Sequence, residues 1–247
     1  AVKSELGKGI PMPLKHGKNL YKLKFDLPDA KLWDLETPYL YQLQAAVLVN
    51  GACTDRLAQQ FGMRSFTQDT ENPQRKGMFY LNGRPIRLRG ANTMGFEQQD
   101  VLRGDLPQLI DDILLAKLCN MNFLRLTQRP VQDEVYEYCD KLGLMTQTDL
   151  PLFGVMRRFH VPEGIRQAEE LARMVRRHPC NVVVSYINEP FPNANNEPHR
   201  HLLRPELESF FTCCDLVVKL SNPDQVIKHV DGDYDPPTDG IPDNHCY

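Results

Sequence analysis

The stretch "VVVSYINEPF" (residues 182–191) opens with a nearly continuous apolar run that stops at Asn188, Glu189 and Pro190. A strand that is apolar on both sides is typical of a parallel sheet whose two faces are both covered. Glu189 is therefore expected at the carboxyl end of a buried parallel strand.

The sequence on either side of this run alternates between strand-like and helix-like segments. The expected strands cover 85–90, 123–127, 144–150, 181–188 and 225–231, and the expected helices cover 105–120, 132–142, 163–177 and 205–221. In the first of these helices Asp105 is the expected N-cap, and Pro107 lies in the first turn. Five strands alternating with helices predict an α/β fold with a parallel sheet, built as a barrel or as an open doubly wound sheet.

Polar side chains at the strand ends favour the barrel. Those in or after the five strands are Arg89, Asn92, Arg125, Thr127, Gln128, Asp149, Asn188, Glu189 and Asp231. Polar groups that converge at the carboxyl ends of many strands form the active site of a (β/α)8 barrel. No Gly-rich phosphate loop follows any expected strand, so the nucleotide-binding open sheet has no support. We predict a (β/α)8 TIM barrel that is incomplete in this chain, because five strands do not close a barrel of eight.

The first quarter of the chain has a different pattern. Strand-like segments cover 21–27, 39–51 and 61–66, and Asn50-Gly51 at the end of the second predicts a hairpin because both residues tolerate positive φ. This part is expected to be the end of a β-sandwich. The polar stretch 68–77 is the expected linker, with one domain over 1–72 and the barrel over 73–247.

Composition excludes several classes of function. The formal net charge is -3, from 29 basic and 32 acidic residues, and no basic surface for nucleic acid is evident. No apolar run approaches the roughly 20 residues of a membrane span, and residues 1–20 lack the pattern of a signal peptide. We expect a soluble protein without membrane or nucleic-acid partners, and cytoplasmic, periplasmic and secreted locations all stay open. The seven cysteines show no spacing suited to zinc, so no metal site is expected.

A Glu at the mouth of a barrel has the chemistry of a general acid. Burial raises the pKa of a carboxyl group toward neutrality, so that it can protonate a leaving oxygen and then recover a proton from water. Glycosidases use this chemistry with two carboxyl groups, one as the acid and one that attacks the sugar or activates water. Asn188 can hold a sugar hydroxyl through its amide. The alternative is that Glu189 is an ordinary loop carboxylate.

Four segments, in this order, resemble glycoside hydrolase family 2, the family of β-galactosidases, β-glucuronidases and β-mannosidases. They are "FYLNGRPIRLRGAN" (79–92), "DDILLAKLCNMNFLRLTQRP" (111–130), "EVYEYCDKLGL" (134–144) and "RMVRRHPCNVVVSYINEP" (173–190). The earlier "KLWDLETPYLYQLQAAVLVNG" (31–51) and "QQFGMRSF" (59–66) look like the end of that family's immunoglobulin-like β-sandwich. The resemblance implies a retaining, exo-acting β-glycoside hydrolase with a carbohydrate substrate and no metal or organic cofactor.

The resemblance also implies roles for individual residues. Glu189 is the implied acid/base, and Asn188 the implied contact to the hydroxyl next to the anomeric carbon. The nucleophile is a second Glu expected beyond residue 247, and Tyr247 matches the family's tyrosine that hydrogen-bonds this nucleophile.

Three further polar residues keep two interpretations each. Arg89 and Arg125 either hold a catalytic carboxylate or form salt bridges inside the barrel. Asp149 either reaches the sugar and orients a neighbour, or caps a loop or helix.

The expected sugar site departs from the pattern of many β-galactosidases and β-glucuronidases. Those have histidines after the first barrel strand and Ser-His-Tyr-Pro at the second, whereas this chain has "ANTMGFE" (91–97) and "LTQRP" (126–130). The residues that replace the imidazoles are Thr93, Met94, Thr127 and Gln128. The identity of the sugar is therefore left open.

A second function remains compatible with the sequence. A sandwich and partial barrel without a nucleophile would be a non-catalytic carbohydrate-binding or relict module. The open strand edges of a partial barrel would also be covered in a homo-oligomer.

Overall fold

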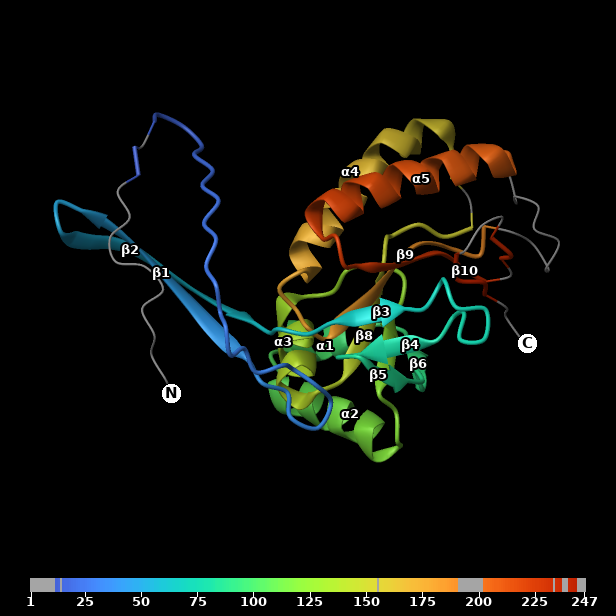
Figure 1. The fold of residues 1–247 in the computed structure, drawn as a ribbon, viewed down its shortest axis with the longest axis horizontal. Coiled ribbons are helices and arrows are strands. Elements are labelled where there is room, and N and C mark those ends of the chain that lie inside the picture. Colours follow the sequence, from blue (N-terminus) through green and yellow to red (C-terminus); the bar gives the residue numbers. More distant parts are fainter. Residues whose placement is uncertain are drawn as a thin grey trace.

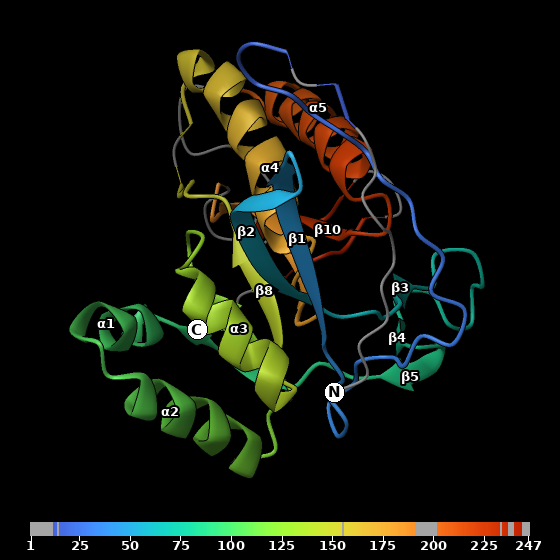
Figure 2. The same ribbon diagram turned by 90° about the vertical axis from the view of Figure 1, so that its left-hand side faces the viewer.

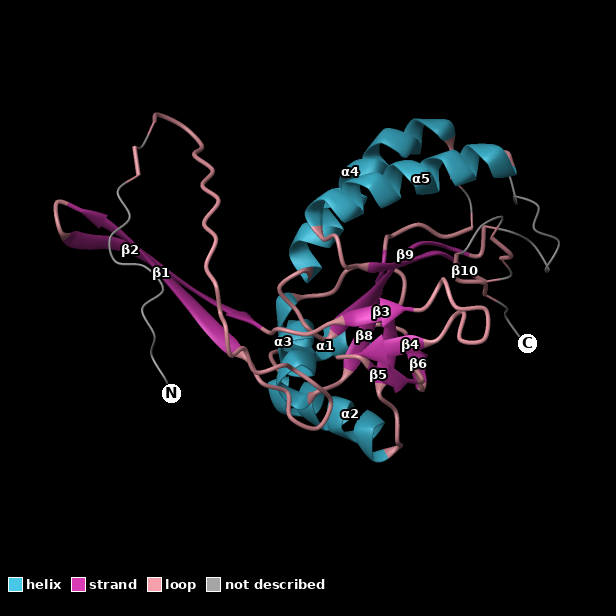
Figure 3. Ribbon diagram, in the orientation of Figure 1, coloured by secondary structure: helices cyan, strands magenta, loops and turns pink. Residues whose placement is uncertain are grey.

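The computed structural model describes residues 12–13, 15–154, 156–190, 202–232, 234–236 and 240–243. Figure 1 shows a long antiparallel hairpin of β1 (Tyr41–Val49) and β2 (Ala52–Phe61) that extends away from an α/β body. The body contains a five-stranded parallel sheet, a three-stranded antiparallel sheet and five α-helices within the described residues (Figure 3).

The parallel sheet has the strand order β10-β9-β8-β7-β6. Its strands are β6 (Gly90–Thr93), β7 (Phe123–Leu126), β8 (Met145–Asp149), β9 (Asn181–Asn188) and β10 (Val226–Asp231). All four neighbouring pairs are parallel. Every residue of β9 is buried, as its apolar sequence predicts. Sequential strands are therefore neighbours in space, and their carboxyl ends meet at one edge.

The helices connect the parallel strands. They are α1 (Phe96–Arg103), α2 (Leu106–Leu118), α3 (Asp133–Leu142), α4 (Val161–Val175) and α5 (Arg204–Ser221). Figures 1 and 2 show α4 and α5 side by side, with α1, α2 and α3 grouped separately from them. The N-cap prediction for α2 is confirmed, because the Asp105 carboxylate accepts a hydrogen bond from the Gln108 backbone at 3.2 Å. Helix α1 was not predicted.

The prediction of one strand over 85–90 is wrong. The turn at Asn82-Gly83, with φ of 51° and 75°, folds β5 (Arg84–Ile86) back onto β4 (Phe79–Leu81), and the first parallel strand begins only at Gly90. Residues 69–78, which include most of the expected linker, form the loop between β3 (Phe66–Gln68) and β4, and these two strands pair in the same sheet. The domain boundary between 72 and 73 stays a prediction.

The hairpin prediction at Asn50-Gly51 is confirmed, with φ of 51° and 81° at the two turn residues. The alternating segment 21–27 forms no strand, so the strand expected there is wrong. Most of β1 and β2 is exposed on both faces. The immunoglobulin-like sandwich itself therefore stays a prediction.

Two side chains fasten the N-terminal segment to the α/β body. The fully buried Trp33 donates from Nε1 to the carbonyl of Asp140 on α3 at 2.7 Å. Lys117 Nζ, at the end of α2, donates to three carbonyls, those of Leu35, Leu142 and Gly143. The segment before the hairpin is thus held against the ends of α2 and α3. Among the described residues, no helix is long and apolar enough to cross a membrane.

Candidate active site

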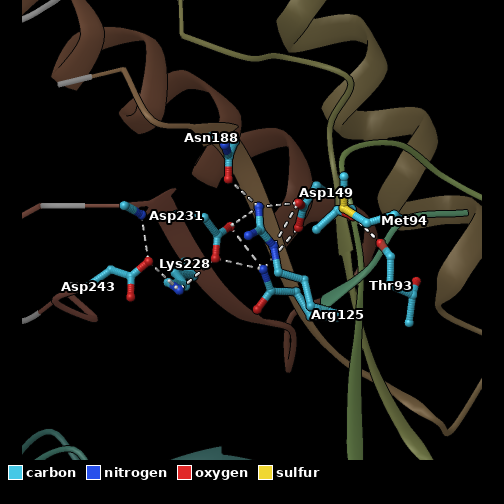
Figure 4. Close-up of polar contacts among 11 residues, drawn as sticks. Thr93, Met94, Arg125, Asp149, Asn188, Lys228, Asp231 and Asp243 are labelled. Carbon is cyan, nitrogen blue, oxygen red and sulfur yellow. Dashed lines mark hydrogen bonds and ion pairs between the residues drawn. The ribbon is translucent and has the colours of Figure 1, made fainter. Parts of the chain in front are cut away.

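Four polar side chains meet where β7, β8, β9 and β10 end (Figure 4). They are Arg125, Asp149, Asn188 and Asp231, and each is at most 6% exposed. The strand register brings these side chains together. Asp231 lies opposite Asn188, and Arg125 lies opposite Gln147, which is on the same face of β8 as Asp149. The sequence prediction that strand-end polar groups converge holds for these four residues.

Arg125 is the centre of the cluster. Its Nε and Nη2 donate to Asp149 Oδ2 at 3.0 and 2.6 Å. Nη2 also donates to Asn188 Oδ1 at 2.7 Å and lies 3.4 Å from Asp231 Oδ2. A guanidinium is a fixed planar array of donors, so this residue sets the relative positions of three side chains from three strands.

The sequence did not predict three residues of the cluster, which are Gln147, Lys228 and Asp243. Gln147 Nε2 donates to Asp149 Oδ1 at 2.9 Å and to the two Asp231 oxygens at 3.0 and 2.9 Å. Lys228 Nζ donates to Asp231 Oδ1 at 2.6 Å and lies 2.9 Å from Asp243 Oδ2 (Figure 4). One signal was available for Gln147, because it alternates with Asp149 along β8 and so shares its face.

The two buried aspartates have different acidities. Burial and the nearby negative charge of Asp231 raise the pKa of Asp149 to about 6, although Arg125 and Gln147 oppose this. Burial also disfavours the charged form of Asp231, but Lys228 and Arg125 outweigh it and hold the pKa of Asp231 below its usual value. Two carboxylates therefore face two cations near neutral pH, and Asp149 is the first of the pair to take up a proton on acidification.

Glu189 follows this cluster directly in the chain. Its φ of 48° lies in the left-handed region, and its backbone N–H donates to the carbonyl of Asp231 at 2.7 Å. The residue is half-buried, and Pro190 after it is buried. A non-glycine residue held at positive φ is typical of functional sites, where the surrounding structure fixes the backbone. Glu189 thus lies at the carboxyl edge of the sheet, as predicted.

The other predicted site residues lie at different places. Asn92 is opposite Arg125 in the β6–β7 register and is exposed, and the half-buried Gln128 follows β7. Arg89 does not reach the cluster, because it precedes β6 and its guanidinium bonds Asn120 at the amino end of β7. That prediction is not supported, since the last residue before a parallel strand lies at the edge opposite the site. Tyr247 lies outside the described residues.

The residues that replace the family's histidines lie together beside the cluster. Thr127 Oγ1 donates to the carbonyl of Thr93 and lies 3.5 Å from Met94 Sδ. Figure 4 shows Thr93 and Met94 on the Asp149 side of Arg125. This side of the edge therefore has Thr and Met side chains at positions where many β-galactosidases and β-glucuronidases have histidines.

Two family models match the chain. Residues 74–205 match "Glycosyl hydrolases family 2, TIM barrel domain", and residues 3–64 match "Glycosyl hydrolases family 2". The first match covers residues 74–205 of the predicted barrel segment 73–247, and the second covers most of the N-terminal segment.

Curated relatives of the chain carry the names of glycosidases. A "Putative beta-glucuronidase" of Formosa agariphila is 35% identical over 134 residues, which is 54% of this chain and 16% of that protein. The "Beta-glucuronidase" of Mus musculus is 29% identical over 180 residues, 68% of this chain and 26% of that protein. A "Beta-galactosidase" of Aeromonas hydrophila is 33% identical over 170 residues, 64% of this chain and 16% of that protein. The chain thus spans about a sixth to a quarter of the length of these relatives.

Solved structures confirm the fold. The crystal structure of a Bacteroides uniformis β-glucuronidase has a TM-score of 0.64 at 24% identity, over 81% of this chain and 24% of that one. The β-glucuronidase of Bifidobacterium dentium, solved with coumarin-3-O-glucuronide, has a TM-score of 0.65 at 24% identity, over 86% of this chain and 34% of that one. The predicted TIM barrel is therefore confirmed, and β6 to β10 are its strands in this chain.

Proposed function

The chain belongs to glycosyl hydrolase family 2, and from this premise we propose that it carries the acid/base half of the active site of a retaining, exo-acting β-glycosidase. The observation that supports the proposal most directly is the position of Glu189. It lies at the carboxyl edge of the barrel, directly after Asn188, whose amide Arg125 holds at 2.7 Å. An acid/base must be held at a fixed place relative to the sugar that it protonates.

In the proposed reaction Glu189 first acts as an acid. It protonates the glycosidic oxygen as the bond to the anomeric carbon breaks, so that the leaving group departs as an alcohol. A second carboxylate attacks the anomeric carbon and forms a glycosyl ester. Glu189 then takes a proton from water, which attacks the ester and releases the sugar with its β configuration retained.

The second carboxylate is proposed to be a Glu beyond residue 247. A retaining pair of carboxyl groups is separated by about 5 Å, and the attacking oxygen must be free to form a covalent bond. Asp149 and Asp231 do not suit this role, because they are 2% and 1% exposed and accept bonds from Arg125, Gln147 and Lys228. We assign both to the support of the site.

The substrate is proposed to be a terminal β-linked sugar. The relatives named above carry the names β-glucuronidase and β-galactosidase, but Thr93, Met94 and Thr127 stand where many such enzymes have imidazoles. Asn92 and Gln128 are proposed as sugar contacts because they lie in and after strands that border the cluster. A panel of p-nitrophenyl β-glycosides, tested on the full-length protein, identifies the sugar.

The leaving-group dependence of Glu189→Gln tests the proposal. Loss of a general acid slows substrates in proportion to their need for protonation. The variant is therefore expected to lose far more activity on an alkyl β-glycoside than on a 2,4-dinitrophenyl β-glycoside of the same sugar. Equal losses on both substrates would remove the acid/base role, and a wild-type protein that binds but never cleaves β-glycosides would favour a binding module.

A further inference from the structure

Gln147 lies between the two buried carboxylates of the site. Its Nε2 is 2.9 Å from Asp149 Oδ1 and 3.0 and 2.9 Å from the two Asp231 oxygens. Because carboxylate oxygens only accept, the atom that faces them must be the amide nitrogen. One amide hydrogen serves Asp149 and the other is shared by the Asp231 carboxylate, so both donors are used.

Arg125 connects Asp149 to Asn188, because it donates hydrogen bonds to both side chains. Asp149 receives Arg125 on one oxygen and Gln147 on the other, so its carboxylate cannot rotate without breaking a bond. Arg125 Nη2 in turn donates to Asn188 Oδ1 at 2.7 Å. Since a guanidinium has no acceptor, it selects the carbonyl side of the Asn188 amide. The Asn188 NH2 group therefore points away from Arg125.

The far end of the chain of contacts is anchored to the backbone. Lys228 holds Asp231 at 2.6 Å and lies 2.9 Å from Asp243, whose carboxylate accepts from the Gly232 N–H at 2.6 Å. Two cations and three aspartates are therefore connected between β7 and the loop after β10. Buried networks of this kind are rigid when every member is satisfied.

We propose that Gln147 is a positioning residue that, through Asp149 and Arg125, fixes the Asn188 amide so that it donates to the oxygen of the sugar hydroxyl next to the anomeric carbon. This inference rests on the proposed function. Gln147 touches no substrate, and its effect is confined to the group that Asn188 recognises. A substrate without that hydroxyl is therefore insensitive to Gln147.

The test compares two substrates and two variants in the full-length protein. The substrates are the best p-nitrophenyl β-glycoside of the panel and its 2-deoxy analogue. Gln147→Met keeps the length of the side chain and removes both donors. Thr148→Val is the control, because Thr148 is equally buried on the next position of β8 and bonds Tyr136 and Asn181 on the other face.

In Gln147→Met, the ratio of kcat/KM for the 2-hydroxy substrate to that for the 2-deoxy substrate should fall about 10-fold, because one oriented hydrogen bond is lost. The ratio should not change in Thr148→Val, even if that variant is less stable. Equal slowing of both substrates in Gln147→Met would overturn the proposal. If Gln147→Met does not fold, Lys228→Met replaces it and should lower the same ratio.

A crystal structure of the same variant separates this inference from the proposed function. It should show the bond from Arg125 Nη2 to Asn188 Oδ1 broken or the amide turned. If the bond persists unchanged, the positioning role is wrong, whether or not the protein cleaves glycosides. If no β-glycoside is cleaved by the wild type, the proposed function fails and the crystal structure alone decides the role of Gln147.

Discussion

At the scale of single residues, Arg125 rather than the proposed acid/base Glu189 holds the polar side chains of the site together. Its one guanidinium contacts side chains from β8, β9 and β10. Lysine would keep the charge but not the planar array of donors, so the two residues are not interchangeable here. Glu189 lies at the edge of the barrel because it directly follows Asn188, the last residue of β9.

The sequence predicted Asn188 and Glu189 because they end an apolar strand, and Asp149 because it lies near the end of the strand expected over 144–150. It did not predict Gln147 or Lys228. Gln147 contacts Asp231 two strands away, Lys228 contacts Asp243 in the loop after β10, and these contacts are known only from the structure. Arg89 was predicted for the site from the assumption that the first strand ends near residue 90. Because β6 begins there instead, Arg89 lies at the opposite edge.

Asp149 makes stability depend on pH in a defined direction. Its pKa of about 6 in the folded protein exceeds the 3.8 of an exposed Asp, so between these values the folded state binds the extra proton. The stability that Asp149 contributes is therefore greatest below about pH 4 and falls by about 3 kcal/mol as the pH rises through 6. The variant Asp149→Asn should not show this pH dependence, because an asparagine side chain does not titrate in this range.

Thermal unfolding of the wild type and of Asp149→Asn between pH 4 and pH 7 measures the effect. The wild type should lose stability relative to the variant as the pH rises to 6, and the difference should then stay constant. If the unfolding temperatures of the wild type and of Asp149→Asn differ by the same amount at every pH from 4 to 7, the pKa of Asp149 is not raised.

At the scale of elements, the sequence predicted best where a long apolar pattern repeats. The ranges of β7 to β10 and of α2 to α5 lie within a few residues of their predictions. The helices each bury one face, and every residue of β8 and β9 is buried. The short elements β5, β6 and α1 were not predicted correctly. Their boundaries depend on turns at Asn82-Gly83 and Gly95, where positive φ changes the direction of the chain.

The N-cap of α2 gives a prediction at this scale. Asp105→Ala removes the carboxylate that accepts from the Gln108 N–H, and this should lower the free energy of unfolding by about 1 kcal/mol. Asp111→Ala is the matched control, because Asp111 is exposed within the same helix and alanine favours helix there. Urea unfolding measures both variants. A loss for Asp111→Ala as large as that for Asp105→Ala would show that capping is not the cause.

At the scale of the whole molecule, the hairpin segment and the barrel segment are joined through buried contacts. Trp33 is fully buried against the body although it precedes the hairpin in the chain. Neither the strand-like pattern of residues 20–68 nor the βα pattern of the barrel segment predicts this contact. It depends on residues 107 positions apart, Trp33 and Asp140.

Truncation of Trp33 tests how far this contact joins the two segments. Trp33→Ala should destabilise the protein by about 3 to 5 kcal/mol, because it leaves a large cavity and removes the bond to Asp140. Trp33→Phe keeps most of the buried surface and should lose about 1 kcal/mol, mainly the hydrogen bond. Limited proteolysis after residues 21–27 should become faster in the alanine variant. Similar losses for the two variants would indicate that packing at Trp33 contributes little.

The measurement that tests the central claim most directly is azide rescue of Glu189→Ala in the full-length protein. With an activated aryl β-glycoside the variant still forms the glycosyl ester but lacks the base that activates water. Azide attacks this ester without a base, so added azide should accelerate turnover and yield the β-glycosyl azide, while the wild type should show neither effect. If azide leaves the rate of the variant unchanged and no glycosyl azide forms, Glu189 is not the acid/base of this site.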